Sequence, residues 1–418
     1  PMNAPLDDAR SLIPCNLCGG HAVTVLSRLS RSGAALRTVA CTACGLAWSD
    51  PRPHEARSFY TDDYRLAYKG SFTPRPKHVL RAGRVALDRL AKIRPWLQGR
   101  PRVLDVGSGG GEFAYLLQRL GHAVTGIEPN NGYGNYAAQA YGLDIRLGFL
   151  SDRLAPGEQF DLITIWHVLE HTEDPGATLR LLAGALRPGG RLVVEVPNVE
   201  ATCQSPRSSF HEAHLYTFNA ATLGCLARRN GLAVCDTRLS ADGGNLTVVL
   251  SPASAADEVP AAQIEGNHAR VAAIVAGHTP LSHALSSHPW RRAWSRLRGA
   301  VSEWVELRAG ENGRAVLDRL YGPTLGKPAE PRPALPAATW VVLGLAYVAG
   351  VAVEEWFVDH WAVANGWSTA ATLGVFLTLQ LAVIAGVIPV ARSHHLIRRE
   401  LLRVGSLAAP LLAIPVVC

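Results

Sequence analysis

Apolar residues in the middle of the chain occur in short runs, most of them separated by helix-length stretches. These runs are rich in β-branched residues and cover residues 102–107, 123–128, 143–147, 160–166 and 191–196. Two further runs, 232–239 and 245–250, have no helix-length insertion between them, which is typical of an antiparallel hairpin. Because strands that alternate with helices build parallel sheets, the pattern predicts an α/β, doubly wound, seven-stranded sheet with this hairpin at its edge.

A glycine cluster follows the first of these runs. Gly107, Gly109 and Gly111 lie between the expected strand and a helical pattern that begins at residue 113. Glycine permits positive φ angles and close approach of a ligand, and the N–H groups that open a helix bind anionic or polar groups. The second run ends at Glu128, an acidic residue suited to ribose hydroxyls. These features predict a nucleotide-type site, although a dinucleotide-dependent dehydrogenase would share them.

Five motifs together resemble class I S-adenosylmethionine-dependent methyltransferases over residues 100–235. They are LDVGSGGG (104–111), GIEP (126–129), FDLITIWHVLEH (160–171), LRPGGRLVVEVPN (186–198) and HLYTF (214–218). The resemblance implies a Rossmann-like methyltransferase sheet and S-adenosyl-L-methionine as the cofactor. It also implies a set of cofactor-binding residues, namely Asp105, Gly107, Ser108, Gly109, Gly111, Glu128, Pro129, Trp166 and His167.

A polar cluster directly after the fourth run is a candidate for the chemistry. His167, Glu170 and His171 are spaced i, i+3, i+4, so we expect them on one face of a short helix. A histidine with a pKa near neutrality suits a general base. The cluster also resembles the Glu-x-x-Glu-His of ubiquinone-type O-methyltransferases, with His167 in place of the first glutamate, and can then hold a divalent cation. The third interpretation is structural, with Glu170 and His171 capping the helix over the cofactor.

A second polar cluster lies in the insertion after the fifth run. His211, Glu212 and His214 occur where this architecture binds substrate. Their positions resemble the Glu–His pair of sugar C-methyltransferases, but the pair is interrupted by an alanine, and hydrogen bonding of the loop to the sheet is the alternative. We take His214 as the first candidate for the general base and His171 as the second. Glu170 and His211 complete the candidate catalytic set.

Four of the eight cysteines form two Cys-x-x-Cys pairs near the N-terminus: Cys15 with Cys18, and Cys41 with Cys44. Two such pairs can bring four thiolates onto one tetrahedral Zn²⁺. A redox role is the alternative, but it requires a thioredoxin-like βαβ setting that the surrounding pattern does not predict. Since four thiolates leave no open position on zinc, we expect a structural metal. This head resembles the four-cysteine head of some bacterial methyltransferases, including sugar C-methyltransferases.

Charge and hydropathy restrict partners and location. Lys and Arg exceed Asp and Glu by 41 to 34, without a long basic arm, so nucleic acid is not an expected partner.

Two segments near the end of the sequence, 337–353 and 368–391, carry no charge. Acidic sequence follows the first and arginine-rich sequence follows the second, as in a transmembrane hairpin. We therefore expect a multi-pass membrane protein with a cytoplasmic catalytic domain; a buried apolar hairpin is the alternative. A basic, Trp-bearing segment at 288–298 suits either an anionic membrane surface or a solvated helix.

The expected organisation has five parts. These are a zinc ribbon (1–54), a helical lid or linker (55–98), a class I methyltransferase domain (99–250), a helical, basic juxtamembrane region with a Pro-rich linker (251–335), and a transmembrane hairpin with a terminal apolar segment (336–418). The expected function is that of a membrane-tethered transferase that methylates an O or C nucleophile of a small-molecule, sugar or lipid-linked acceptor. The competing function is a non-catalytic membrane scaffold that retains the cofactor fold as a docking or sensing module.

Overall fold

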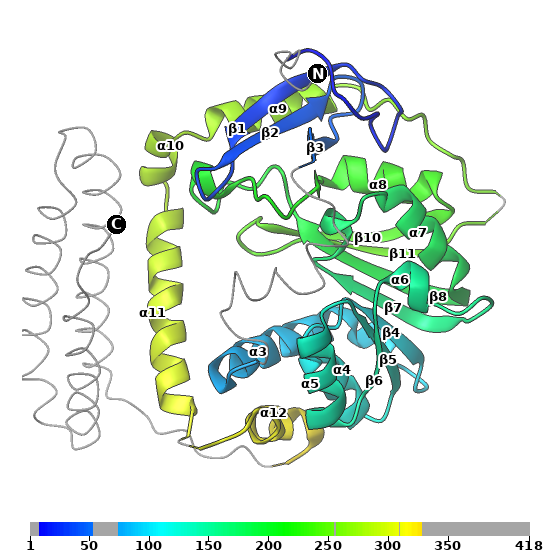
Figure 1. Cartoon of the computed structure of the whole chain (residues 1–418), viewed down its shortest axis with the longest axis vertical. Coiled ribbons are helices and arrows are strands. Elements are labelled where there is room, and N and C mark those ends of the chain that lie inside the picture. Colours follow the sequence, from blue (N-terminus) through cyan, green and yellow to red (C-terminus); the bar gives the residue numbers. More distant parts are fainter. Residues whose placement is uncertain (1–7, 53–73, 255, 309, 328–418) are drawn as a thin grey trace, which may run out of the picture. The chain divides into compact units, whose positions relative to one another are not determined.

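The computed structural model describes residues 8–52, 74–254, 256–308 and 310–327 (Figure 1). The chain divides into two compact units, residues 1–289 with 307–330, and residues 290–306 with 331–418. Of the second unit, the description covers most of one helix, α11 (His288–Glu306). The candidate site lies wholly within the first unit, which the following paragraphs describe.

The central sheet of the first unit has seven strands in the order β10-β11-β8-β7-β4-β5-β6. Strands β4 to β8 run parallel, whereas β11 is antiparallel to both β8 and β10, so the predicted parallel core and edge hairpin are confirmed. The strands are β4 (Arg102–Val106), β5 (Ala123–Glu128), β6 (Asp144–Leu147), β7 (Phe160–Trp166), β8 (Leu186–Pro197), β10 (Leu232–Leu239) and β11 (Asn245–Pro252).

The fifth parallel strand differs from the prediction, because β8 begins at Leu186 and includes the glycine turn that was expected to precede it. Its pairing with β7 shifts register there, between Phe160–Leu186 and Leu162–Arg191. The side chain of Arg187 spans the irregular stretch, with Nη1 donating to both carboxylate oxygens of Asp161 at 3.0 and 2.9 Å. An ion pair thus holds the turn against β7.

Helices cover both faces of the sheet. Alternation along β4 illustrates this: Val103 packs with α3, α4, α5 and α12, whereas Leu104 and Val106 pack with α7 and α8. These helices are α3 (Pro76–Ile93), α4 (Glu112–Arg119), α5 (Asn131–Tyr141), α7 (Pro175–Gly184), α8 (Ala220–Arg229) and α12 (Gly313–Tyr321). The other described helices are η2 (Arg94–Trp96), α6 (Leu150–Arg153), η3 (Leu169–His171), η4 (Pro206–Ser208), α9 (Asn267–Gly277), α10 (Pro280–Ala284) and η5 (Gly322–Leu325).

A second, smaller sheet joins the N-terminal head to the domain that follows it. Its order is β1-β2-β3-β9, and all its pairs are antiparallel. Strands β1 (Val23–Leu29), β2 (Ala35–Cys41) and β3 (Ala47–Ser49) belong to the head, but β9 (Tyr216–Thr217) comes from the insertion after β8. Head residues such as Trp48 also share one apolar core with the central sheet. The head and the domain are therefore one packed body.

Among the described residues, no helix combines the length and the apolar character needed to cross a membrane. The longest, α11, has 19 residues and includes four arginines, Arg291, Arg292, Arg296 and Arg298. The expected multi-pass membrane location is contradicted by this finding, and the lipid-linked acceptor inferred from it loses its basis. Segments 337–353 and 368–391, on which that expectation rested, lie outside the described residues, as do residues 55–73 of the predicted lid.

The fold makes a testable distinction between two glycines with positive φ. A Cβ on Gly111 (φ +82°) would lie 2.7 Å from Cβ of Ala137 and 2.8 Å from Cδ1 of Leu143, whereas a Cβ on Gly142 (φ +70°) would meet nothing within 4 Å. Gly142→Ala should cost about 1 kcal/mol of unfolding free energy from backbone strain alone. Gly111→Ala should cost about 2–4 kcal/mol, because overpacking adds to the strain. Urea denaturation measures both, and equal losses would contradict the close packing.

Candidate active site

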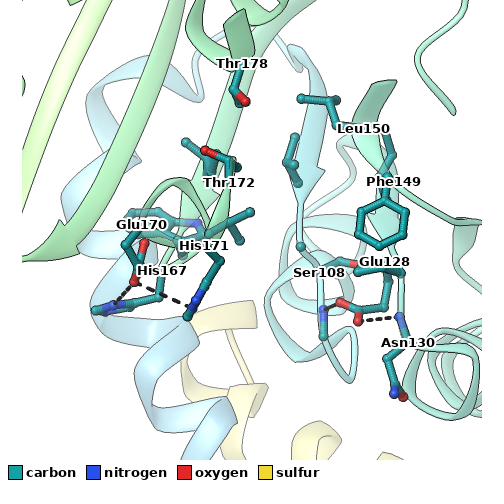
Figure 2. A pocket seen from close by; sticks show the side chains of 18 of the residues that line it. Ser108, Glu128, Asn130, Phe149, Leu150, His167, Glu170, His171, Thr172 and Thr178 are labelled. Carbon is teal, nitrogen blue, oxygen red and sulfur yellow. Dashed lines mark hydrogen bonds and ion pairs between the residues drawn. The ribbon is translucent and has the colours of Figure 1, made fainter. Parts of the chain in front are cut away.

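A cavity of about 820 Å³ lies at the carboxyl ends of β4, β5 and β7, the edge at which open α/β sheets bind ligands. Its volume suits a cofactor-sized ligand with room for a second molecule. Its wall is built from the glycine loop after β4, the end of β5, residues 148–151, the segment 165–174 after β7, one side of α3, and His214. Figure 2 shows Ser108, Glu128 and Asn130 on one side of the cavity and His167, Glu170 and His171 on the other.

Backbone hydrogen bonds hold the glycine loop and Glu128 together at the cavity. N–H groups of Gly109 and Asn130 donate to the two carboxylate oxygens of Glu128, at 2.7 and 2.9 Å (Figure 2). Gly107 requires glycine, since a Cβ there would lie 2.3 Å from Cγ2 of Val168. Ser108 Oγ is buried without a hydrogen-bond partner among the described residues. Buried hydroxyls normally have a hydrogen-bond partner. The hydroxyl of Ser108 therefore fits a loop that binds a ligand.

Most of the predicted cofactor-binding residues line this cavity: Gly107, Ser108, Gly109, Glu128, Pro129, Trp166 and His167. Asp105 and Gly111 are not among its lining residues. Asp105 lies in the buried strand end and accepts from Thr164 Oγ1 at 2.8 Å, and burial raises its pKa to about 6. Gly111 packs against Ala137 and Leu143 instead. These two residues support the loop from behind.

The segment after β7 is a tight turn in place of the expected helix. His167 has φ +55°, and only Leu169–His171 forms a single 3₁₀ turn. A non-glycine residue in this left-handed region costs roughly 1–2 kcal/mol, so the surroundings must hold it there. They do so through two carboxylates: His167 Nδ1 lies 3.3 Å from Oε1 of Glu170, and Nε2 lies 3.4 Å from Oε1 of Glu195.

These contacts determine the charge of His167. Burial alone would lower its pKa, but the ion pairs with Glu170 and Glu195 outweigh burial and raise the pKa to about 9. Burial opposes ionisation of both carboxylates as well. The charge of His167 nevertheless lowers the pKa of Glu170 to about 2, and His167 together with Lys92 and Thr247 lowers that of Glu195 to about 2. At neutral pH, His167 is therefore a cation between two anions, so it serves to fix Glu170 and not to accept a proton.

The neighbouring histidines have a different pattern. His171 Nδ1 lies 2.7 Å from the carbonyl oxygen of Ala213, and because a carbonyl only accepts, Nδ1 carries the proton in the neutral ring and Nε2 has the lone pair. The ring of His214 lies edge-on to that of His171, with 5.0 Å between centroids. Burial, followed by the positive potential of His171, lowers the pKa of His214 to about 3. Both rings face the cavity.

His211 stands one layer further back than the other catalytic candidates. Its ring stacks on His214 with 5.0 Å between centroids, and it does not belong to the residues that line the cavity. Ligand atoms of Glu170, His171 and His214 all lie within 4.8 Å of one another. This trio can therefore hold a cation as well as move a proton, but it contains His214 in place of His167, which the cation interpretation drawn from the sequence had included.

Two charged residues at the site, the half-buried Arg89 and the buried Glu195, escaped the prediction. Arg89 on α3 lines the cavity, its guanidinium lies 4.9 Å from the centroid of the Trp166 ring, and burial lowers its pKa. Arg89 follows Ala86 by three residues and precedes Ile93 by four, which places it on the apolar face of α3. This helical spacing could have identified Arg89 from the sequence. Glu195 interrupts an apolar run in β8 and is bound by Lys92, Thr247 and His167.

The four cysteines of the head come together as predicted. Sγ atoms of Cys15 and Cys44 lie 3.5 Å apart, those of Cys18 and Cys41 lie 3.4 Å apart, and all four lie within 4.8 Å of one another. A disulfide would require about 2.05 Å. Four sulfurs on a tetrahedron with zinc bonds of about 2.3 Å would lie about 3.8 Å apart. The donor set and its spacing therefore fit a tetrahedral metal ion.

The charge assigned to His167 can be measured through its ring resonances. In an NMR titration, we expect His167 to titrate near pH 9, and Glu195→Gln to move its pKa toward the ordinary value of about 6.5. Because the folded-state pKa of His167 is the higher one, the stability that its protonated ring contributes is complete below about pH 6.5 and is lost as pH rises through 9. The lowered pKa values of Glu170 and Glu195 add a separate loss as pH falls below 4.5. Glu158→Gln, which removes a partner of Arg102 and Arg146, is the control. Titration of His167 near 6.5 in the unsubstituted chain would contradict the assignment.

Comparison with known proteins identifies the part of the chain that carries this site. A family model described as "Methyltransferase domain" matches residues 78–237. The ubiquinone biosynthesis O-methyltransferase of Aeromonas salmonicida (strain A449) is 32% identical over 120 residues, which are 27% of this chain and 50% of that protein. The enzyme of the same name from Xylella fastidiosa (strain 9a5c) is 39% identical over 131 residues, 30% of this chain and 51% of that protein.

The chain spans about half the length of these curated relatives. Among solved structures, the CcbJ methyltransferase from Streptomyces caelestis matches with 16% identity and a TM-score of 0.37, over 48% of this chain and 100% of that chain, too distant a likeness to bear on function. The family match includes the glycine loop, Glu128 and the segment after β7. Residues 78–237 therefore match a methyltransferase domain.

Proposed function

We propose that this chain transfers a methyl group from S-adenosylmethionine to an oxygen atom of a small-molecule acceptor. The observation that supports it most strongly is that one cavity connects the glycine loop and Glu128 with the pair His171 and His214. A cofactor at the loop would thus face two histidines, of which His214 is neutral at physiological pH. The relatives, which are named O-methyltransferases, support oxygen as the methylated atom.

The described residues suggest how the cofactor is held. When bound, S-adenosylmethionine supplies an electrophilic methyl group on a sulfonium ion. The backbone at 107–109 and the guanidinium of Arg89 suit its amino acid end, since a buried guanidinium binds a carboxylate through two parallel hydrogen bonds. Glu128 suits the ribose hydroxyls, and Phe149 and Leu150 line the cavity where an adenine ring would need apolar contact.

Proton removal falls to the histidines. In the proposed reaction, Nε2 of His171 accepts the hydroxyl proton while the acceptor oxygen forms its bond to the methyl carbon and the carbon–sulfur bond breaks. The anionic carboxylate of Glu170, with Oε1 3.9 Å from His171 Nε2, stabilises the imidazolium that results. The pKa of His214, at about 3, favours His171 over His214 as the base, which reverses the order taken from the sequence. Both assignments stay predictions.

Oxygen is favoured over carbon as the acceptor atom by the position of Glu212. In the sugar C-methyltransferase interpretation, Glu212 and His214 act together. Glu212 is instead bound by the hydroxyls of Ser30 and Ser32 in the head, and it is not among the residues that line the cavity.

Zinc is proposed as a structural ion of the four cysteines, on the spacing of their sulfurs. The competing function, a non-catalytic scaffold, would bind the cofactor without transferring its methyl group.

Cofactor binding is tested through Arg89. By isothermal titration, we expect Arg89→Ala to weaken the binding of S-adenosylmethionine by about 10- to 100-fold, because a charge-assisted pair contributes about 1.5–3 kcal/mol. Arg81→Ala, an exposed arginine on the same helix, should leave the affinity unchanged. An unchanged affinity of Arg89→Ala would remove Arg89 from the site. Preference of the unsubstituted chain for NAD would refute the function itself.

The base is tested by comparing three histidines. If His171 takes the proton, His171→Ala should lower kcat by about 10²-fold or more while cofactor affinity is retained. His214→Ala should have the smaller effect, and His268→Ala, at a half-buried residue bound to Thr24 and outside the cavity lining, should have none. Steady-state kinetics with a methyl acceptor measures all three. A larger loss in His214→Ala than in His171→Ala would restore His214 as the base.

A further inference from the structure

The segment 210–217, which carries His211 and His214, is held from its catalytic side by the turn after β7. The N–H of Leu215 donates to the carbonyl of Glu170 at 2.8 Å, and His171 Nδ1 donates to the carbonyl of Ala213 at 2.7 Å. The position of this segment therefore determines how the rings of His171 and His214 lie against each other.

The head holds the same segment from the other side, at both of its ends. At the first end, the N–H of Arg31 donates to the carbonyl of Phe210 at 2.8 Å, and the hydroxyls of Ser30 and Ser32 donate to Glu212. All three donors lie in the turn between β1 and β2. This turn is the tip of the hairpin that leads back to Cys41.

At the second end, strand β3 of the head pairs with β9. Trp48 faces Tyr216 in this pairing, and the N–H of Ser49 donates to the carbonyl of Leu215 at 3.0 Å. Ser49 Oγ donates to the carbonyl of His214 itself at 3.1 Å. Because Ser49 is buried, these bonds have no competition from water. The backbone of His214 is thus fixed by a residue of the head.

The cysteine pairs stand directly behind these contacts. Cys41 ends β2, Cys44 precedes β3 by three residues, and the turn between them is closed by Gly45 N–H to Cys41 O at 2.8 Å and Cys41 N–H to Leu46 O at 2.9 Å. The pair Cys15 and Cys18 is also connected to the cavity, through Asn16. Asn16, between Cys15 and Cys18, donates to Asp174 Oδ1 and accepts from the N–H of Gly176, both at 2.9 Å, and Asp174 lines the cavity.

We propose that metal binding by the four cysteines positions His214 and His171, so that the head is a working part of the active site and not an independent module. This inference rests on the proposed methyl transfer. The metal would fix the β2–β3 turn, β3 would fix the backbone at 214–217, and Ser49 is the positioning residue that connects them. The cofactor loop has other supports, since Gly107 and Gly109 bond to Ile127 and Glu128 of β5. Metal occupancy should therefore govern methyl transfer without governing cofactor binding.

Hydrogen exchange on the full chain tests the coupling without any need for activity. Two samples of the chain are compared: one holds one bound zinc, verified by metal analysis, and the other has had its zinc removed by a chelator. We expect amides of 210–217 to exchange at least about 10-fold faster without zinc, and amides of 107–111 to change by less than about 2-fold. S-adenosylmethionine affinity should be retained. Unchanged exchange at 210–217 after verified loss of zinc would overturn the proposal, as would equal acceleration in both segments.

A substitution with zinc in place gives the second arm. Ser49→Ala removes the hydroxyl bound to the His214 carbonyl, and we expect kcat to fall by about 10-fold with the KM for the cofactor unchanged. Ser27→Ala, which removes another head hydroxyl bonded to a carbonyl, that of Leu29, is the matched control and should keep full kcat. A normal kcat in Ser49→Ala, or a loss confined to cofactor KM, would overturn the role of Ser49. Absence of methyl transfer in the unsubstituted chain would refute the proposed function alone, because the exchange experiment judges the coupling separately.

Discussion

The geometry of the candidate active site depends on the backbone of residues 213–217, which is hydrogen-bonded to Glu170 and His171 on one side and to β3 of the head on the other. A buried backbone group that loses its partner costs about 1–3 kcal/mol, so this segment cannot shift without breaking several such bonds at once. His214 is thereby held against His171, with the rings edge to face. The head and the sheet share one apolar core around this segment, which excludes water from the same bonds.

Charge is arranged around this frame so that the neighbouring groups have different protonation states. His167, held by Glu170 and Glu195, is protonated at neutral pH, whereas burial keeps His214 neutral. The ion-paired His167 fixes Glu170, which in the proposed reaction would stabilise the positive charge that develops on His171. His167 and His214 thus differ in charge because their surroundings differ. Proteins generally adapt one residue type to several tasks in this way.

The sheet and much of the cavity could be predicted from the sequence, because they follow from local pattern. Strand alternation marks Val103 and Leu104 for opposite faces, and the glycine loop and Glu128 end neighbouring strands that meet at one edge. What escaped prediction depends on tertiary contacts. Strand β9 has only two residues and no pattern of its own. The φ of His167 is imposed by one carboxylate three residues away and by a second on β8. The membrane prediction relied on hydropathy and flanking charge, without any feature of the folded chain.

The most direct test of this account is a crystal structure of the zinc-loaded chain with S-adenosylhomocysteine. The account predicts the ligand in the described cavity, with its carboxylate beside Arg89, its ribose hydroxyls on Glu128, and its sulfur facing His171 and His214 across space for an acceptor. The same structure should contain one metal ion bound by Cys15, Cys18, Cys41 and Cys44. A ligand bound elsewhere, or one whose sulfur is turned away from both histidines, would contradict it.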